Sequence, residues 1–495
     1  QKMGFVKPVW SLPRLPAILN AHMHRFQFTA IMLVSHIVFI VLFGVYVSFD
    51  ELFAMPSAAN DNTYLNTKYP YYMGTHVIIF IGFAYLMSFL KRYGYSAISI
   101  NMLLACLTIE WAVLCRGLFS KQFAETGTIS LNIDHLLHAD FSAACILITM
   151  GVVLGKLSPT QYVIMTLIEV PISQATELLC RDVYKINDAG GSIVVHVFGA
   201  YFGIALSLAF ARKTQRAHEH DASLYHTDMF AMLGTLFIFV NWPSLNAATT
   251  VTAEAHHRAI INTHLSLVGC TLATFLVCPI FEPRKKFNMV QIANSTLAGG
   301  VAIGTCANVV LDPILSLTIG SVAGVISVLG YIYLTPYLSA RLALHDTCGL
   351  HNLHGMPGIL AGLFSAVMAV AYPKERFGAS LASIYPAMAS NSTGTGESQT
   401  ESGQALMQLA GLGTVLGVSI ISGALTGIFL RLPCINQVRS EEYFADGDYF
   451  HTPDDYEFTT KISGKVRHEH VLGHGDKTSS VQQRIIHHDQ EDSSA

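Results

Sequence analysis

The sequence predicts an all-α polytopic membrane protein with about twelve transmembrane helices. Hydrophobic residues make up 52% of the 495-residue chain and charged residues only 13%, which is too apolar for an ordinary soluble protein. Long windows with few or no charged residues follow one another with short gaps between them. A helix that crosses a membrane needs ~20 apolar residues, and many of these windows reach that length.

Nine windows are clear candidates for spanning helices, and they cover residues 26–49, 69–90, 189–211, 229–253, 259–281, 287–311, 313–340, 347–373 and 402–430. Three further windows, 93–109, 140–155 and 157–180, are short or contain an acidic residue, and they complete the set. We expect the first window to be a retained helix rather than a cleaved signal peptide. It is longer than the apolar region of a typical signal peptide, and it follows a long N-terminal tail.

Charge and composition predict the organisation of the chain. Residues 1–25 are expected to form a cytosolic N-terminal segment, residues 26–430 the transmembrane domain, and residues 431–495 a polar cytosolic tail with a disordered distal part. Placing both termini inside satisfies the positive-inside rule, because most loop Lys and Arg residues then lie in the cytoplasm. The loop 374–401 then lies outside, where Asn391 begins a glycosylation sequon.

The cysteines indicate neither a metal site nor a disulfide framework. None of the nine forms a CxxC pair, and such pairs are the usual mark of a zinc ribbon. Most lie inside predicted helices, where a free thiol behaves as a small apolar residue. Cys115 and Cys180 both lie near the outer ends of predicted helices, so the sequence leaves a disulfide between them open.

Two stretches of the chain repeat one pattern. DAGGSIVVHVFGAYFGI begins at Asp188, and DTCGLHNLHGMPGILAGL begins at Asp346. In both, a glycine follows the aspartate by three residues and a histidine follows it by eight, which places His196 and His354 at matching positions. The two predicted helices run in opposite directions across the membrane. Two five-helix halves related by an inverted pseudo-two-fold axis place their shared site near the midplane, so we expect the two histidines to meet there.

A buried pair of histidines is suited to one class of solute. Burial without a counter-charge disfavours the imidazolium form, so both rings are expected to be neutral. Each neutral ring has one donor and one acceptor nitrogen, so two facing rings satisfy each other and leave one nitrogen each for a solute. A small neutral molecule such as ammonia fits these groups. The alternative is that the two rings only join helices and bind no substrate.

Three other residues of the repeats have simpler interpretations. His351 precedes His354 by three residues and is expected to be a half-buried neighbour on the same helical face. Asp188 and Asp346 are candidates for helix caps, because a carboxylate accepts hydrogen bonds from exposed backbone N–H groups. They are equally candidates for acids on the substrate side of a pathway, and the two roles are compatible.

These motifs resemble those of the Rh glycoproteins, the animal branch of the ammonium transporter and Rh superfamily. The resemblance is carried by DAGGSIVVHVFGAYFG, ADFSAACILITMGVVLGKLSP, WPSLNAA and HDTCGLHNLHGMPG, and it spans residues 28–430. It implies an ammonium transporter-like fold: a five-plus-five inverted repeat, eleven core helices and an additional N-terminal helix. It also implies a homotrimer with one pore per subunit, in which His196 and His354 are the twin histidines that line the pore.

The resemblance further assigns the outer part of the pore. Phe141, in ADF, matches one aromatic residue of the outer gate, Asp188 the acid before the first histidine, and Glu177 an acid near the outer vestibule. One position departs from the pattern, because Leu245 stands where the family usually has phenylalanine after WPS. A phenyl face attracts a cation, whereas an isobutyl group only occludes, so cation recruitment at this gate is in doubt.

The expected function is that of a membrane channel or facilitator for ammonia. Ammonium would be recruited at an acidic outer vestibule and lose its proton near the gate, and ammonia would then pass His196 and His354. Moving a charge through ~30 Å of low-dielectric pore is costly, whereas a neutral solute needs only a few polar contacts. The sequence leaves open whether transport is electroneutral and whether methylamine or carbon dioxide also passes.

Three other functions compete with this one. A non-transporting Rh-like scaffold is weakened by the presence of both histidines, although Leu245 keeps it open. A haem-binding membrane protein is less favoured, because haem ligation by axial histidines usually uses several histidine pairs on facing helices. A carrier of the major facilitator type fits poorly with an inverted repeat. The sequence contains no nucleophile, metal cluster or phosphate loop with a specific spacing, so we expect neither enzymatic activity nor a cofactor.

The expected partners are ammonia or ammonium, two further copies of the chain, the lipid bilayer, and a cytoskeletal or adaptor protein at the C-terminal tail. No feature of the sequence indicates binding to nucleic acid. The expected location is the plasma membrane, with both termini in the cytoplasm.

Overall fold

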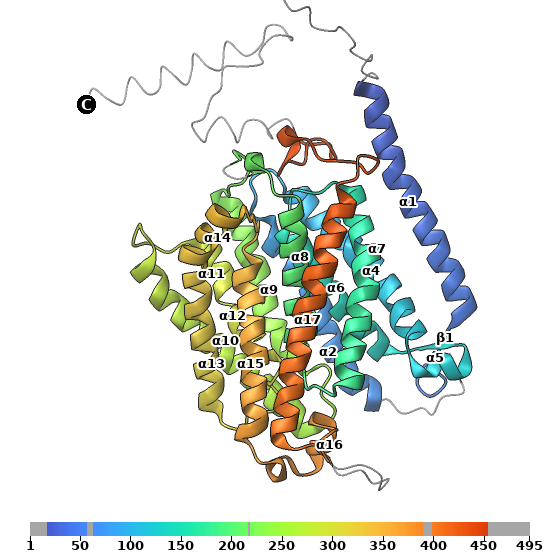
Figure 1. Ribbon diagram of the computed structural model, residues 1–495, viewed down its shortest axis with the longest axis vertical. Helices are drawn as coiled ribbons and strands as arrows, with labels where there is room; N and C mark the ends of the chain where they lie inside the picture. Colours follow the sequence, from blue (N-terminus) through green and yellow to red (C-terminus); the bar gives the residue numbers. More distant parts are fainter. Residues whose placement is uncertain (1–16, 57–62, 216–217, 390–397, 454–495) are drawn as a thin grey trace, which may run out of the picture. The chain divides into compact units, whose positions relative to one another are not determined.

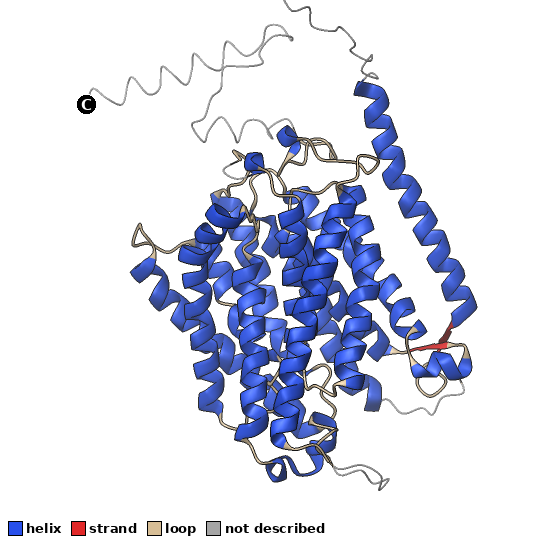
Figure 2. Cartoon of the chain, viewed as in Figure 1, coloured by secondary structure: helices blue, strands red, loops and turns tan. Residues whose placement is uncertain are grey.

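The computed structural model describes residues 17–56, 63–215, 218–389 and 398–453. These residues are mostly helical, with one pair of three-residue strands (Figure 2). Eleven of the described helices are long and apolar enough to cross a membrane. The prediction of an all-α polytopic membrane protein is therefore confirmed.

The first half of the core contains five spanning segments (Figure 1). In chain order they are α2 (Thr63–Val77) with η1 (Ile78–Gly82) and α3 (Phe83–Leu86), α4 (Gly94–Leu118), α6 (Ile133–Val152), α7 (Pro159–Leu178), and η4 (Ser192–Val197) with α8 (Phe198–Ala209). Side-chain caps begin two of them. Asn132 accepts from the backbone N–H of His135 before α6, and Ser158 forms a reciprocal capping box with Gln161 before α7.

The second half repeats this series in the same order. Its segments are α9 (Tyr225–Ala247), α10 (Ala253–Phe281), α11 (Met289–Ser295) with α12 (Ala298–Gly304), α13 (Pro313–Leu329) with η6 (Gly330–Leu334) and α14 (Thr335–Leu342), and η7 (His351–Gly355) with α15 (Met356–Ala371). Two long helices flank the halves, α1 (Ala17–Tyr46) and α17 (Glu401–Leu430). The shorter elements include α5 (Lys121–Thr126), α16 (Leu381–Ile384), β1 (Val47–Phe49) and β2 (Ile129–Leu131). Five further short helical turns complete the described chain: η2 (Met87–Phe89), η3 (Leu179–Val183), η5 (Lys213–Gln215), η8 (Lys374–Ser380) and η9 (Ser440–Glu442).

Burial separates a central set of helices from a peripheral one. The most apolar 18-residue window is 83% buried in α6 and also in the η4–α8 segment, whereas in α1 it is only 6% buried. Helix α8 packs against α6 and α17, and η4 contacts α15 of the second half. The two histidine segments therefore lie at the centre of the protein, and α1 lies at its edge.

The two ends of the transmembrane domain lie on the same side of it. The Gln27 amide, near the start of α1, donates to the Cys434 carbonyl oxygen at 2.8 Å and accepts from the Asn436 backbone N–H at 2.9 Å. Both partners follow α17. An even number of crossings requires this arrangement, and the eleven spanning helices together with the α11–α12 segment make twelve.

The expectation of a continuous helix over residues 287–311 is wrong. The structure divides this window into α11 and α12, which have seven residues each, and the chain is unwound beyond Gly304. The freed carbonyls of Gly304 and Thr305 accept from the backbone N–H groups of Gly190 and Ala189, at 2.9 Å and 3.4 Å. Non-helical backbone is tolerated at membrane depth where other parts of the protein satisfy it.

A disulfide between Cys115 and Cys180 is also contradicted. Both are buried free thiols, and the Cys180 sulfur instead lies 4.0 Å from the Gly411 carbonyl oxygen of α17. The two histidine helices also begin later than predicted. They begin at Ser192 and His351 rather than at 189 and 347, because the residues between each aspartate and its helix form a turn.

The first part of the C-terminal tail packs on the transmembrane domain. The described residues up to Asp448 belong to one compact unit with the helices. Phe444 is fully buried, and the Asp446 carboxylate accepts from the backbone N–H groups of Tyr95 and Ser96 at the start of α4, each at 2.9 Å. Burial raises the pKa of Asp446. The distal tail and the sequon at Asn391 lie outside the described residues.

Candidate functional site

The two histidine segments share one backbone geometry. Gly191 and Gly349 follow the two aspartates and have positive φ angles of 69° and 70°, a conformation that side chains with a Cβ rarely adopt. After each glycine the chain enters a π-helical turn, η4 or η7, which contains the histidine and then continues as an α-helix. Such turns are rare and occur often at functional sites. The repeat that the sequence predicts is therefore present in the backbone.

Asp188 caps the first histidine segment. Its Oδ2 accepts from the backbone N–H groups of Ile193 at 3.1 Å and Val194 at 2.9 Å, and its Oδ1 accepts from the Thr305 hydroxyl at 2.7 Å. The side chain is 1% exposed. Three donors on one buried carboxylate hold the first turn of η4 in place, which is the capping role that the sequence left open.

Asp346 caps the second segment with fewer contacts. Its Oδ2 accepts from the His351 backbone N–H at 2.8 Å, and its Oδ1 has no hydrogen-bond partner among the described residues. The His351 ring is partly buried, and its Nε2 lies 3.4 Å from the Tyr201 hydroxyl. His351 is therefore the half-buried neighbour that its spacing predicts.

His196 and His354 meet at the centre of the protein. Their Nδ1 atoms lie 2.9 Å apart, and their rings are stacked with centroids 5.0 Å apart and planes within 6°. The rings are 2% and 1% exposed. Both Nε2 atoms lack a hydrogen-bond partner among the described residues. The predicted pairing of two histidines from opposite halves of the chain is thus present in the structure.

Two aromatic rings enclose the pair. Trp242 stacks on His196 at 5.8 Å between centroids and 22° between planes, and Phe83 stacks on His354 at 6.1 Å and 19°. Each histidine therefore has one larger aromatic ring beside it. The sequence alone indicates no role for Phe83, whereas Trp242 lies within the WPSLNAA motif and could have been found there.

A narrow cavity lies beside the stacked rings. Its volume of about 10 Å³ is roughly what one water-sized molecule needs. Apart from the two histidines and Trp242, every lining residue is apolar; the lining comprises Ile78, Phe83, Leu86, Ala144, His196, Ile238, Trp242, Leu245, Leu297, Leu353 and His354. The surface that faces the cavity is apolar, and the ring nitrogens of the two histidines and Trp242 lie behind it.

The two gate positions lie in different places. Leu245 is 3% exposed and lines the cavity beside the histidines. Phe141 is buried but is not part of the cavity lining. Its ring lies 6.4 Å from that of His138, and a Cβ on Gly191 would be 3.4 Å from its Cδ1. Phe141 therefore covers the turn that begins the first histidine segment.

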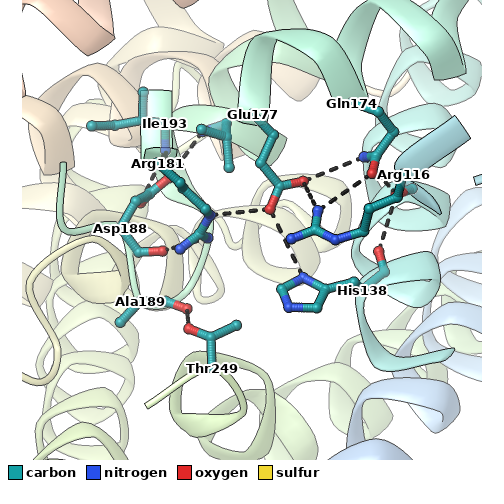
Figure 3. Close-up of polar contacts among 11 residues, drawn as sticks. Arg116, His138, Gln174, Glu177, Arg181, Asp188, Ala189, Ile193 and Thr249 are labelled. Carbon is teal, nitrogen blue, oxygen red and sulfur yellow. Dashed lines mark hydrogen bonds and ion pairs between the residues drawn. The ribbon is translucent and has the colours of Figure 1, made fainter. Parts of the chain in front are cut away.

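Glu177 lies in a cluster of charges rather than alone (Figure 3). Arg116 Nη1 lies 3.2 Å from its Oε2, and Arg181 Nε lies 3.0 Å from its Oε1. The Gln174 amide donates to Oε2 at 3.3 Å. Arg181 also donates to the backbone carbonyl of Asp188 at 2.8 Å. Two guanidinium groups more than balance the single carboxylate, so Glu177 does not make this region acidic.

Glycines bring the helices of the site close together. A Cβ on Gly199 would lie 2.4 Å from the Cys145 carbonyl oxygen of α6, and one on Gly358 would lie 2.6 Å from Val197 Cγ2. Real Cβ atoms do not approach other atoms so closely, so these backbones touch only because both residues are glycine. Glycines at these two positions therefore allow the helices of the site to pack closely.

A buried cation lies near one end of the site. The Lys156 ammonium donates to the Val152 carbonyl at 2.8 Å, to the Ser207 hydroxyl at 3.0 Å and to the His345 carbonyl. Lys156 lies between α6 and α7, outside the spanning helices, and is 1% exposed. Burial lowers the pKa of Lys156 to about 8. Its three acceptors join α6, α8 and the chain before Asp346.

Comparison with known proteins places this arrangement in a family. A model described as the Ammonium Transporter Family matches residues 38–447. An ammonium transporter Rh type B-B of Xenopus laevis is 39% identical over 440 residues, covering 87% of this chain and 94% of the relative. An ammonium transporter Rh type C of Canis lupus familiaris is 38% identical over 441 residues, covering 87% and 95%.

Solved structures show the same fold. The structure of Nitrosomonas europaea Rh50, from a study of conduction by the Rhesus protein family of channels, matches with a TM-score of 0.68 and 32% identity over 81% of this chain and 97% of that one. Saccharomyces cerevisiae Mep2 matches with a TM-score of 0.59 and 15% identity over 77% and 89%, which supports the fold alone. The inverted repeat, the paired histidine segments and these matches together show that the chain belongs to the ammonium transporter family, in its Rh branch.

Proposed function

We propose that this chain is a membrane channel for ammonia. The observation that carries the proposal is the pair of stacked neutral rings, His196 and His354, whose Nε2 atoms have no hydrogen-bond partner among the described residues beside a cavity for one small molecule. Relatives named ammonium transporters share 38–39% of their residues with the chain, which supports the choice of substrate.

The contact between the two histidines determines what the pair offers. A hydrogen bond between two Nδ1 atoms requires one to donate and the other to accept. The ring that donates from Nδ1 then has a bare Nε2, and the other ring has a protonated Nε2. The pair therefore presents one acceptor and one donor. Ammonia, which has three N–H groups and one lone pair, can use both, whereas ammonium has no lone pair for the donor.

The cavity excludes charge. Its lining contains no charged side chain, and stripping water from an unpaired ammonium costs far more than the few hydrogen bonds it would regain. Ammonium must therefore release its proton before the cavity, and ammonia alone passes the rings. Conduction on this account carries no current through the pore.

The roles of the remaining site residues follow from their contacts. Leu245 and Phe141 restrict access to the histidine pair. Neither supports cation binding in the cavity, because Leu245 offers only an apolar isobutyl group and the Phe141 ring does not line the cavity. Asp188 and Asp346 hold the histidine segments by capping them. Glu177 is neutralised by its arginines, and we assign it the task of holding Arg181 against the Asp188 carbonyl.

We also propose a homotrimer in the plasma membrane with both termini in the cytoplasm. The contacts of Gln27 with residues after α17 support termini on one side, and the distribution of Lys and Arg supports the cytoplasmic side. Asn391 then faces outward, and glycosidase treatment of protein from eukaryotic cells tests its glycosylation. A cytosolic adaptor or cytoskeletal protein at the tail is a further part of this proposal.

A flux assay tests the function. Proteoliposomes that contain a pH-sensitive dye are mixed rapidly with an ammonium salt, and entering ammonia raises the lumenal pH. We expect faster alkalinisation than in empty liposomes. The double variant His196→Leu/His354→Leu fills the space but removes two hydrogen bonds of ~1 kcal/mol each, which is about 30-fold in rate. No rise above empty liposomes would favour a non-transporting scaffold.

A further inference from the structure

A second buried glutamate lies in the core and has no place in the account so far. Glu169 is in α7 and is 0% exposed. Its Oε1 lies 2.5 Å from the Thr149 hydroxyl of α6 and 4.0 Å from the Cys145 sulfur. The same Thr149 hydroxyl lies 2.9 Å from the Gly199 carbonyl oxygen of α8. Three helices are therefore joined through one carboxyl and one hydroxyl group.

The protons in this chain can be counted. A hydroxyl group has one hydrogen to donate, yet the Thr149 oxygen lies within hydrogen-bond distance of two acceptors if Glu169 is ionised. A carbonyl oxygen cannot donate, so both contacts are hydrogen bonds at once only if Thr149 donates to the Gly199 carbonyl oxygen and a protonated Glu169 Oε1 donates to Thr149. The geometry therefore favours an uncharged carboxyl group.

The surroundings of Glu169 support the same protonation state. No basic side chain in the described part of the chain pairs with it, and Oε2 has no hydrogen-bond partner there. A lone carboxylate in a low-dielectric interior is costly and takes up a proton instead. Glu177 is eight residues later on the same helix and is equally buried, but it lies between two guanidinium groups. One helix therefore carries two buried glutamates in opposite charge states.

The position of this chain connects it to the histidine pair. Gly199 follows His196 by three residues, at the point where the π-helical turn becomes the regular helix α8. A Cβ on Gly203 would lie 2.9 Å from Val152 of α6, so α6 and α8 are already in backbone contact here. The link from Glu169 through Thr149 fixes α8 along α6 one turn from His196.

We propose that Glu169 is an uncharged positioning residue that, through Thr149, holds α8 where His196 meets His354. As far as it concerns conduction, this inference rests on the proposed function. It predicts that the charge of Glu169 is unimportant and that its hydrogen bond is essential. A glutamine at this position is neutral and still donates to Thr149, so it preserves the link. A leucine does not.

Substitutions test the role in conduction. Glu169→Gln is expected to conduct ammonia within about twofold of the unmodified protein, with an unchanged pH profile. Glu169→Leu and Thr149→Val are expected to lose at least fivefold, and Thr149→Ser to regain most of it. Glu177→Gln is the matched comparison on the same helix, and it is expected to fail where Glu169→Gln succeeds. The proposal would be overturned if Glu169→Leu conducted ammonia as fast as the unmodified protein. It would also be overturned if Glu169→Gln and Glu169→Leu lost equal amounts of flux.

Infrared spectroscopy tests the protonation state without a flux measurement. The purified protein at neutral pH is expected to show the C=O absorption of a protonated carboxyl group that is lost in Glu169→Gln. Glu125→Gln, at an exposed position of α5, is the control and should retain the band. If Glu169→Gln retains every C=O band of the unmodified protein, the uncharged state of the Glu169 carboxyl group is refuted. This conclusion holds even if variants fold poorly. If the unmodified protein conducts no ammonia, the proposed function fails, and the infrared result still decides the state of Glu169.

Discussion

Replacing Asp188 by alanine and by asparagine separates a capping role from a cation-binding role. Alanine leaves the buried backbone N–H groups of Ile193 and Val194 without their acceptor, at ~1–3 kcal/mol for each unsatisfied donor. The expected loss of stability is therefore about 2–6 kcal/mol. Asparagine keeps one oxygen for both N–H groups, and its NH₂ can donate to Thr305, whose hydroxyl then accepts. Only the charge-assisted part of the bonds is lost, ~1 kcal/mol.

The assay combines two measurements on each variant of Asp188. Thermal unfolding of the detergent-solubilised protein, followed by tryptophan fluorescence, reports stability, and dye-loaded proteoliposomes report ammonia flux. We expect Asp188→Ala to unfold several degrees lower and to lose most flux, and Asp188→Asn to retain most of both. If the carboxylate bound ammonium directly, the uncharged asparagine would lose as much flux as alanine. Equal flux losses in the two variants would therefore refute the capping argument.

Three further outcomes are expected from the same measurements. Asp346→Ala should lower the unfolding temperature less than Asp188→Ala, because its carboxylate accepts only one backbone N–H; an equal or larger drop would contradict this. Glu177→Gln should destabilise the fold by about 3 kcal/mol, because two guanidinium groups lose their counter-charge, and unchanged thermal unfolding would count against the cluster. Burial lowers the pKa of Lys156 from 10.5 to about 8 in the folded protein. Between these two pH values the unfolded chain binds more protons at Lys156 than the folded protein does. The free energy of unfolding therefore rises with pH over this range, by ~3 kcal/mol in all. Lys156→Met should abolish that rise in unfolding temperature between pH 8 and 10, and a persisting rise would exclude Lys156 as its source.

The spanning helices and the histidine pair could be predicted because their signals are local. Apolar windows locate the helices, although some ends differ by up to nine residues, as at the end of α4, which was expected at residue 109 and lies at Leu118. The spacing from aspartate to glycine to histidine is visible in each copy. The inverted repeat turns that local match into a contact between residues 158 positions apart. Even the φ angles of Gly191 and Gly349 follow from the repeated pattern, since glycine is the residue that adopts them freely.

Other features could not be predicted because they depend on distant parts of the chain. The unwound chain at the end of α12 is stabilised by backbone donors of Ala189 and Gly190, which lie more than a hundred residues earlier. The neutralisation of Glu177 depends on Arg116, which comes from a different helix. An acid in a sequence window has no visible partner, so the resemblance could mark Glu177 as an acid near the vestibule but could not show its pairing. The structure pairs this carboxylate with two guanidinium groups.

The most direct test of the account is the membrane current that accompanies ammonia entry. Proteoliposomes in which lumenal pH and current are recorded together are exposed to an inward ammonia gradient. The account predicts fast alkalinisation without current, because neutral rings in an apolar cavity pass ammonia and not ammonium. A current that scales with the flux would contradict conduction of the neutral molecule past His196 and His354.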